Sequence, residues 1–211
     1  MTPRLLLAAL LAALLLPATA EAKKSCTRGG ATLEASSGDV RVVRRELKTQ
    51  SAQETRREAV SMCWARTGER KRIALEQDFG EDLISRTSLE IVDERYVGVV
   101  ETGEGGVSIG VVAAVWDARK GKRLHTSAVR CKGDDDDFRG PDDVAFLTRG
   151  GMAFACGPLW FFKNAAQKTA TQLEPASAGA GRLGVASRSD SFVDRLYWTL
   201  SDGTVKTLDL L

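Results

Sequence analysis

An aromatic strand-turn-strand pattern that occurs four times restricts the fold of this sequence more than any other feature. Each copy is an apolar run with an aromatic residue, then a polar turn, then a second strand-like run. The copies are residues 62–75 (MCWARTGERKRIAL), 114–127 (AVWDARKGKRLHTS), 159–172 (LWFFKNAAQKTATQ) and 196–209 (LYWTLSDGTVKTLD). Short alternating patterns with Gly and Asp breaks are typical of strands. We therefore expect four hairpins in an all-β chain.

The four copies are irregularly spaced, and further strand-like runs precede each of them. The aromatic positions Trp64, Trp116, Phe161 and Trp198 are separated by 52, 45 and 37 residues. The expected units cover approximately residues 31–80, 81–131, 141–176 and 181–211. Repeated antiparallel units of about 40 residues build β-propellers. The chain resembles secreted β-propeller-like repeat proteins, which implies an array of about four antiparallel units of three to four strands.

Residues 31–37 (ATLEASS) and Trp116-Asp117 bear on how such an array is completed. If residues 31–37 pair with the last unit, the ring closes and no sheet edge stays exposed. A β-sandwich and an open half-propeller are the alternatives, so a monomer or a homodimer is expected. Trp116-Asp117 looks like the dipeptide that closes a WD-type blade, but the Gly-His partner is missing. We expect Trp116 to pack between neighbouring sheets.

Residues 1–22 predict a secretory signal peptide. Arg4 precedes an apolar stretch that ends at Pro17, and small residues follow at Ala18, Ala20 and Ala22. The apolar stretch is shorter than the ~20 residues of a membrane-spanning helix. We expect a secreted, extracellular or cell-envelope protein without a membrane span, with one domain over residues 23–211.

Four cysteines, Cys26, Cys63, Cys131 and Cys156, follow the signal peptide. An even number in an oxidising compartment predicts two disulfides. Three pairings are open, and we favour Cys26 with Cys63 and Cys131 with Cys156 because each pair is close in sequence. A zinc site is disfavoured because no C-x-x-C pair is present and His125 is the only histidine.

The charges are segregated along the chain. Residues 23–72 contain thirteen basic and six acidic residues, whereas residues 73–143 contain nine basic and sixteen acidic ones. The basic third is typical of solvated outer strands, and a surface that binds phosphates or sulfated glycans is the functional alternative. Nucleic acid is not expected, because aromatic residues for base stacking do not interleave with the cations. The basic candidates are Arg41, Arg44, Arg45, Arg56, Arg57, Arg66, Arg70, Lys71 and Arg72.

The acidic residues suggest two further hypotheses. The run Asp134, Asp135, Asp136 and Asp137 offers oxygen ligands for calcium, although its spacing is not that of a calcium loop. Calcium is the one cofactor that the sequence suggests. A solvated acidic loop is the other interpretation. Paired carboxylates of a glycoside hydrolase could come from five candidates. These are Glu90, Asp93, Glu94, Glu101 and Glu104.

No catalytic residue is assigned from the sequence. A nucleophile needs a base within reach, and His125 is expected to be a structural strand residue, either on the strand surface or packed. We therefore expect a non-enzymatic binding module for a protein or an anionic polymer. An extracellular hydrolase acting on a polymer at the mouth of a propeller is the alternative.

Overall fold

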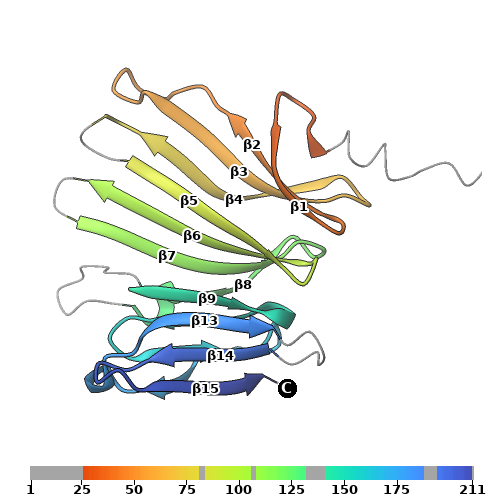
Figure 1. Ribbon diagram of the computed structural model, residues 1–211. Helices are drawn as coiled ribbons and strands as arrows, with labels where there is room; N and C mark the ends of the chain where they lie inside the picture. The colour runs from red at the N-terminus through yellow and green to blue at the C-terminus, as the bar shows by residue number, and fades with distance from the viewer. Residues whose placement is uncertain (1–25, 81–83, 106–107, 132–140, 188–193, 211) are drawn as a thin grey trace, which may run out of the picture.

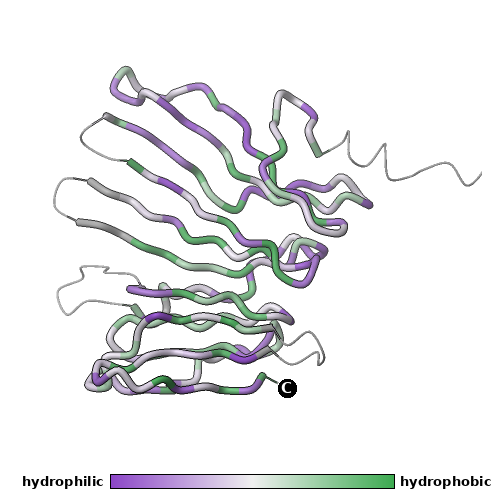
Figure 2. Tube along the Cα trace, viewed as in Figure 1, coloured by the Kyte–Doolittle hydropathy of each residue, from purple (hydrophilic) through white to green (hydrophobic). Residues whose placement is uncertain are grey.

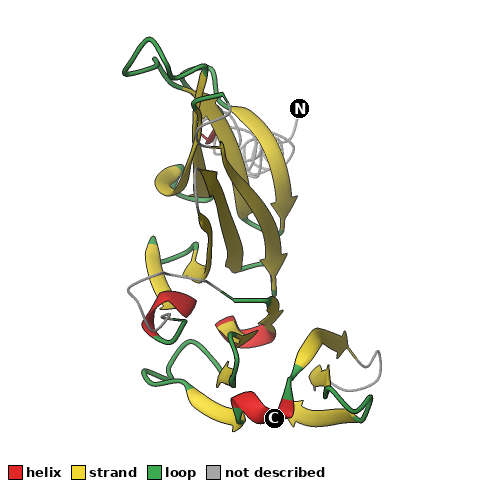
Figure 3. Cartoon of the chain, turned by 90° about the vertical axis from the view of Figure 1, so that its left-hand side faces the viewer, coloured by secondary structure: helices red, strands yellow, loops and turns green. Residues whose placement is uncertain are grey.

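The computed structural model describes residues 26–80, 84–105, 108–131, 141–187 and 194–210, which form an all-β fold. Antiparallel strands build sheets of eight, four and three strands, and none of these described sheets closes on itself. Figure 1 shows the eight-stranded sheet towards one end of the molecule, and the labelled strands of the two smaller sheets towards the other. A view from the side shows the eight-stranded sheet at one end and the C-terminus at the other (Figure 3).

The eight-stranded sheet contains two groups of four consecutive strands. The first group is β1 (Thr32–Ser37), β2 (Val40–Glu46), β3 (Arg56–Trp64) and β4 (Glu69–Asp78). The second group is β5 (Ile84–Val92), β6 (Tyr96–Gly105), β7 (Ser108–Asp117) and β8 (Lys122–Thr126), followed by the 3₁₀ turn η1 (Ser127–Val129). Only the pair Asp78 and Ile84 joins β4 to β5. The sheet thus continues across the unit boundary expected after residue 80, but through a single pair.

The two smaller sheets are the third and fourth groups. The third group is β9 (Asp143–Leu147), η2 (Thr148–Gly150), β10 (Gly151–Ala155), β11 (Leu159–Phe162) and β12 (Thr171–Glu174). The fourth group is η3 (Ala176–Ala178), β13 (Gly181–Ser187), β14 (Asp194–Thr199) and β15 (Val205–Leu210). The four predicted hairpins are all present, as β3–β4, β7–β8, β11–β12 and β14–β15. In the second, Gly121 has a φ of 61°, which a glycine adopts without strain.

Each group shares a buried apolar core with the next group. Val42 and Met62 of the first group pack with Val97 and Val99 of the second. Tyr96 and Val115 of the second group pack with Phe146 and Phe154 of the third. Leu147 and Phe161 of the third group pack with Leu196 and Trp198 of the fourth. Because successive side chains of a strand point to opposite faces, each middle group contributes to two cores.

The two end groups bury only one face in these cores, and their outer faces are not paired with each other. Residues 31–37 were the candidate for closing a ring, but β1 pairs with β2. It lies at the other end of the molecule from β15 (Figure 1). The condition under which this segment would complete a ring with the last unit is therefore not met.

Two disulfides join Cys26 to Cys63 and Cys131 to Cys156, the two pairs favoured from the sequence. The first pins the N-terminal turn onto β3, where Ala31 and Val43 complete a small cluster. The second belongs to the core between the second and third groups. Two disulfides indicate an oxidising extracellular environment. No helix among the described residues is long and apolar enough to cross a membrane.

His125 is a packed strand residue, which is one of the two environments expected for it. Its ring stacks on Phe162 with 4.2 Å between centroids, and Nε2 donates to the Asn164 carbonyl at 3.0 Å. Burial lowers the pKa of His125 below its ordinary value of 6.5, although hydrogen bonds to backbone atoms of Asn164 and Gly150 oppose this. The folded chain therefore holds this imidazole neutral where an unfolded chain begins to protonate it.

This lowered pKa predicts an acid-sensitive contribution to stability. The contribution is complete above the unfolded pKa of about 6.5 and is lost as the pH falls toward the folded pKa, because the unfolded state binds the proton more readily. Denaturant unfolding at about pH 7.5 and about pH 5 measures it, and His125→Phe should reduce the difference between the two. An unchanged difference would show that other groups cause the pH dependence.

Candidate functional site

The predicted basic residues divide between the two faces of the first group of strands. On β2, Val40 and Val42 lie in the first core, so Arg44, two positions further, faces the same side. Val43 packs on the outer side against Cys63, and Arg41 and Arg45 share that side. Neighbouring arginines in the sequence therefore have opposite surroundings.

The outer side of β2 to β4 and the turn before β1 form a surface that we call the arginine face. Its members are Arg28, Arg41, Arg45, Arg70 and Arg72. Arg41 and Arg70 are both opposite Cys63 in the strand register, and Arg72 is opposite Ser61. With strands ~4.8 Å apart, the two arginines flanking Cys63 are about 10 Å apart at their Cα atoms. Hydrophilic stretches are visible along β2 and β3 (Figure 2).

No described carboxylate pairs with an arginine of this face. Arg41 Nη1 donates to the carbonyls of Gly38 and Val40 at 2.6 and 2.8 Å. Arg70 Nη1 donates to the Arg28 carbonyl at 2.8 Å, which ties it to the N-terminal turn. Arg28, Arg45 and Arg72 are exposed. The face thus carries five positive charges that the described ion pairs leave uncompensated, which produces a local positive potential.

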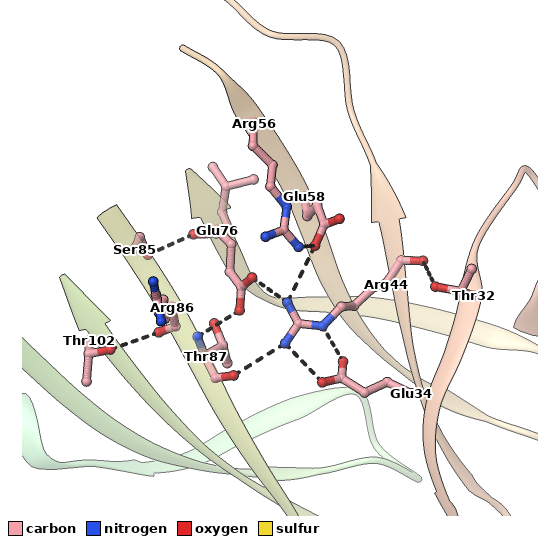
Figure 4. Close-up of polar contacts among 11 residues, drawn as sticks. Thr32, Glu34, Arg44, Arg56, Glu58, Glu76, Ser85, Arg86, Thr87 and Thr102 are labelled. Carbon is pink, nitrogen blue, oxygen red and sulfur yellow. Dashed lines mark hydrogen bonds and ion pairs between the residues drawn. The ribbon is translucent and has the colours of Figure 1, made fainter. Parts of the chain in front are cut away.

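Arg44 is the centre of a different arrangement, an ion-pair network on the inner side of the sheet (Figure 4). Its guanidinium donates to both carboxylate oxygens of Glu34 at 2.6 and 2.9 Å. It also forms ion pairs with Glu76 and, at 3.6 Å, with Glu58, whose carboxylate contacts Arg56 at 2.7 Å. Burial lowers the pKa of Arg44, but hydrogen bonds and charge from Glu34 and Glu76 outweigh this and raise it. Arg44 is thus permanently charged.

This network bridges the place where β4 and β5 separate. Glu76 Oε1 accepts from the Thr87 backbone N–H at 2.7 Å, and Arg44 Nη2 donates to the Thr87 carbonyl at 3.3 Å. Nearby, Ser85 Oγ donates to the Leu75 carbonyl at 3.4 Å. Side chains therefore satisfy backbone groups that a continuous strand ladder would otherwise pair. Arg44 and its carboxylates support the sheet. They also supply part of the lining of an adjoining cavity of about 430 Å³, in which Arg44, Arg56 and Glu76 are paired, whereas Asp78 and Arg86 form no described ion pair.

Two more of the predicted basic residues are also paired. Arg57 lies 3.8 Å from Glu54, and Arg66 forms an ion pair with Asp39. Lys71 is exposed and opposite Met62, so it belongs to the inner side of the strands. The structure therefore brings only Arg41, Arg45, Arg70 and Arg72 of the sequence candidates together, and adds Arg28.

The hydrolase candidates do not converge on one site. Glu90 is opposite Gly98, on the side of the sheet that Phe146 covers, whereas Glu101 is three residues from Gly98 and on the other side. Burial raises the pKa of Glu90, and burial also raises the pKa of Glu101 against the opposing charge of Arg123. The backbone of β6 places Glu104 opposite Ile84, far along the strand from the β5–β6 turn.

That turn carries the remaining two acidic candidates. Asp93 and Glu94 have φ values of 55° and 48°, as in the tight turn of a two-residue hairpin. The calcium candidates Asp134 to Asp137 lie outside the described residues. Within the described residues, no group of three or more His, Cys, Asp or Glu side chains has a metal-binding arrangement.

Trp116-Asp117 has a structural role. Trp116 packs against the core between the first and second groups, which belong to one sheet, whereas packing between neighbouring sheets was expected. Asp117 is buried and accepts from Arg95 Nη2 at 2.8 Å and from the Lys120 backbone N–H at 3.2 Å. It thereby anchors the β7–β8 turn to the β5–β6 turn.

Four such turns surround a cavity of about 770 Å³, which we call the turn pocket. It is lined by Gly38, Asp39, Trp64, Arg66, Thr67, Glu94, Arg95 and Arg119. They come from the β1–β2, β3–β4, β5–β6 and β7–β8 turns, so one end of the first two groups is hollow. Of these eight residues, only Trp64, Arg66 and Glu94 were candidates for any role from the sequence alone. The one sequence signal for the turn pocket was that its residues fall in alternate turns of consecutive antiparallel strands, which lie at the same end of the sheet.

Comparison of the chain with protein-family models, with curated proteins and with solved structures finds no match.

Proposed function

We propose that the protein is a secreted, non-enzymatic β-propeller-like module that binds an anionic polymer on its arginine face. The order of the strands supports the propeller-like arrangement, because four consecutive groups pack through three successive cores. We infer an open array, in which the first group has an outer face without a partner sheet. The observation that carries the function is the set of five arginines that form no ion pair with a carboxylate of the described residues.

The chemistry of this face suits repeated anionic groups. A guanidinium presents several N–H donors in a plane and matches the oxygens of a carboxylate or sulfate. Several such contacts along one chain add, and each also releases counterions from the polymer. The Cys26–Cys63 disulfide lies beneath the face, and Arg70 donates to the Cys26 carbonyl at 3.4 Å. The arginines are thus presented on a rigid base, which reduces the entropy lost on binding.

Removal of three of these charges should weaken binding without unfolding the chain. The variant is Arg28→Gln, Arg45→Gln and Arg72→Gln, which are exposed and make no described side-chain contact. For heparin as the probe, we expect the dissociation constant at about 50 mM salt to rise by about 10- to 100-fold, with the salt slope reduced by about two to three. Isothermal titration calorimetry over a series of salt concentrations measures both.

A matched variant tests whether location or net charge matters. Lys122→Gln, Lys163→Gln and Lys168→Gln removes three exposed charges outside the arginine face. It should change the dissociation constant less than threefold. Equal losses in the two variants would show non-specific attraction and would contradict the proposal, as would a wild-type protein that does not bind the probe.

A further inference from the structure

The turn pocket contains polar groups of complementary kinds around one aromatic side chain. Trp64 is half-buried, with its inner part against the first core. Arg95 is held in place by buried Asp117 at 2.8 Å. Arg119 is exposed and has no described carboxylate partner. The turn pocket has a volume of about 770 Å³, which lies in the range of small-ligand sites, about 300–1,000 Å³.

The two acidic groups of the pocket are fixed by the turns. Asp39 forms an ion pair with Arg66. Glu94 lies against Gly38, where a Cβ would come within 2.7 Å of its Oε2. Since Gly38 has a φ of 52°, both the turn and the close approach of Glu94 require glycine there. The carboxylates therefore remain beside the cavity as hydrogen-bond acceptors.

We propose that the turn pocket binds a carboxylated sugar residue of the anionic polymer, an inference that rests on the proposed function. A sugar ring has apolar C–H groups on its faces, which pack on the indole of Trp64. Its carboxylate pairs with Arg119, the guanidinium that has no carboxylate partner in the described part of the chain. Its hydroxyl groups donate to Asp39 and Glu94. An acidic saccharide satisfies all three kinds of group, whereas a simple anion leaves the aromatic and the acceptors unused.

The pocket is continuous with the arginine face through Arg41. This arginine belongs to the face and donates to the carbonyl of Gly38, which lines the pocket. A polysaccharide with one residue in the pocket therefore passes directly onto the outer side of β2. The turn pocket recognises the carboxylated sugar residue, and the arginine face binds the rest of the polysaccharide.

The experiment uses the full mature chain and a uronic acid trisaccharide, trigalacturonate. Tryptophan fluorescence and calorimetry should both report binding. Arg119→Glu should weaken binding of the trisaccharide at least tenfold. Lys120→Glu is the matched control, because Lys120 is the next residue of the same turn, is exposed and does not line the pocket. It should change the affinity less than twofold.

Two further comparisons establish the sugar and the aromatic contact. The methyl-esterified trisaccharide lacks the charge and should bind at least tenfold more weakly than the free acid. Trp64→Phe keeps an apolar ring in the core and should reduce the fluorescence change on binding by more than half. Equal affinity for acid and ester, or equal effects of Arg119→Glu and Lys120→Glu, would overturn the inference.

The same variants separate this inference from the proposed function. If Arg119→Glu leaves trisaccharide binding intact while the triple arginine variant still loses heparin, the pocket inference fails alone. If the triple variant keeps full heparin affinity, the arginine face is wrong. In that case, binding of the trisaccharide that depends on Arg119 would still support the pocket.

Discussion

Replacing Arg44 with methionine is expected to lower the free energy of unfolding by about 2 to 3 kcal/mol, between the usual effects of breaking an exposed and a fully buried ion pair. The side chain of Arg44 is 20% exposed. Those of its carboxylate partners are 30% exposed for Glu34, 17% for Glu58 and 10% for Glu76. Methionine preserves much of the side-chain volume but leaves the carboxylates without their common cation. The Thr87 carbonyl also loses its donor. Chemical denaturation measures the loss.

Arg56→Met is the control for this prediction. Arg56 contacts the same Glu58 but is 58% exposed, so its removal should cost less than about 1 kcal/mol. A double variant, Arg44→Met with Glu76→Gln, should recover part of the lost free energy of unfolding, because the Glu76 carboxylate no longer remains as an unpaired charge. If Arg44→Met is no more destabilising than Arg56→Met, the network does not stabilise the sheet at the place where β4 and β5 separate.

Local features of the fold could be predicted, because they depend on neighbouring residues. The four hairpins follow from strand-turn-strand patterns, and turn residues such as Gly121 favour the left-handed backbone that a tight turn needs. The disulfide pairs also follow from sequence distance. Whether residues 31–37 close a ring was left open by the sequence, and in the structure β1 pairs with the adjacent β2 instead. Sequential strands pair more often than distant ones.

The division of the arginines could not be predicted from the sequence. Arg44 and Arg45 are adjacent, yet one is the centre of an ion-pair network and the other is exposed. Which face an arginine occupies depends on the register, and the register shifts between Val60 and Ser61. The carboxylates that compensate Arg44 come from β1, β3 and β4, so a single-strand pattern contains no sign of them. The turn pocket likewise collects residues from four separate turns.

Replacing Gly98 with alanine should cost about 3 kcal/mol, the upper part of the usual range for an overpacked core. Gly98 on β6 is buried, and a Cβ there would overlap the ring of Phe146 on β9. The ring has little freedom to move, because it belongs to the core between the second and third groups. The substitution therefore separates the third group from the eight-stranded sheet, and chemical denaturation should show the loss.

Gly181→Ala is the matched control, because a Cβ at that strand position meets no atom within 4 Å. It should change the free energy of unfolding by less than about 0.5 kcal/mol. Adding Phe146→Leu to Gly98→Ala should recover part of the loss, since the smaller side chain makes room for the methyl group. If Gly98→Ala is as mild as the control, the third group does not pack on β6. The successive cores that support the proposed open array would then be interrupted at their centre.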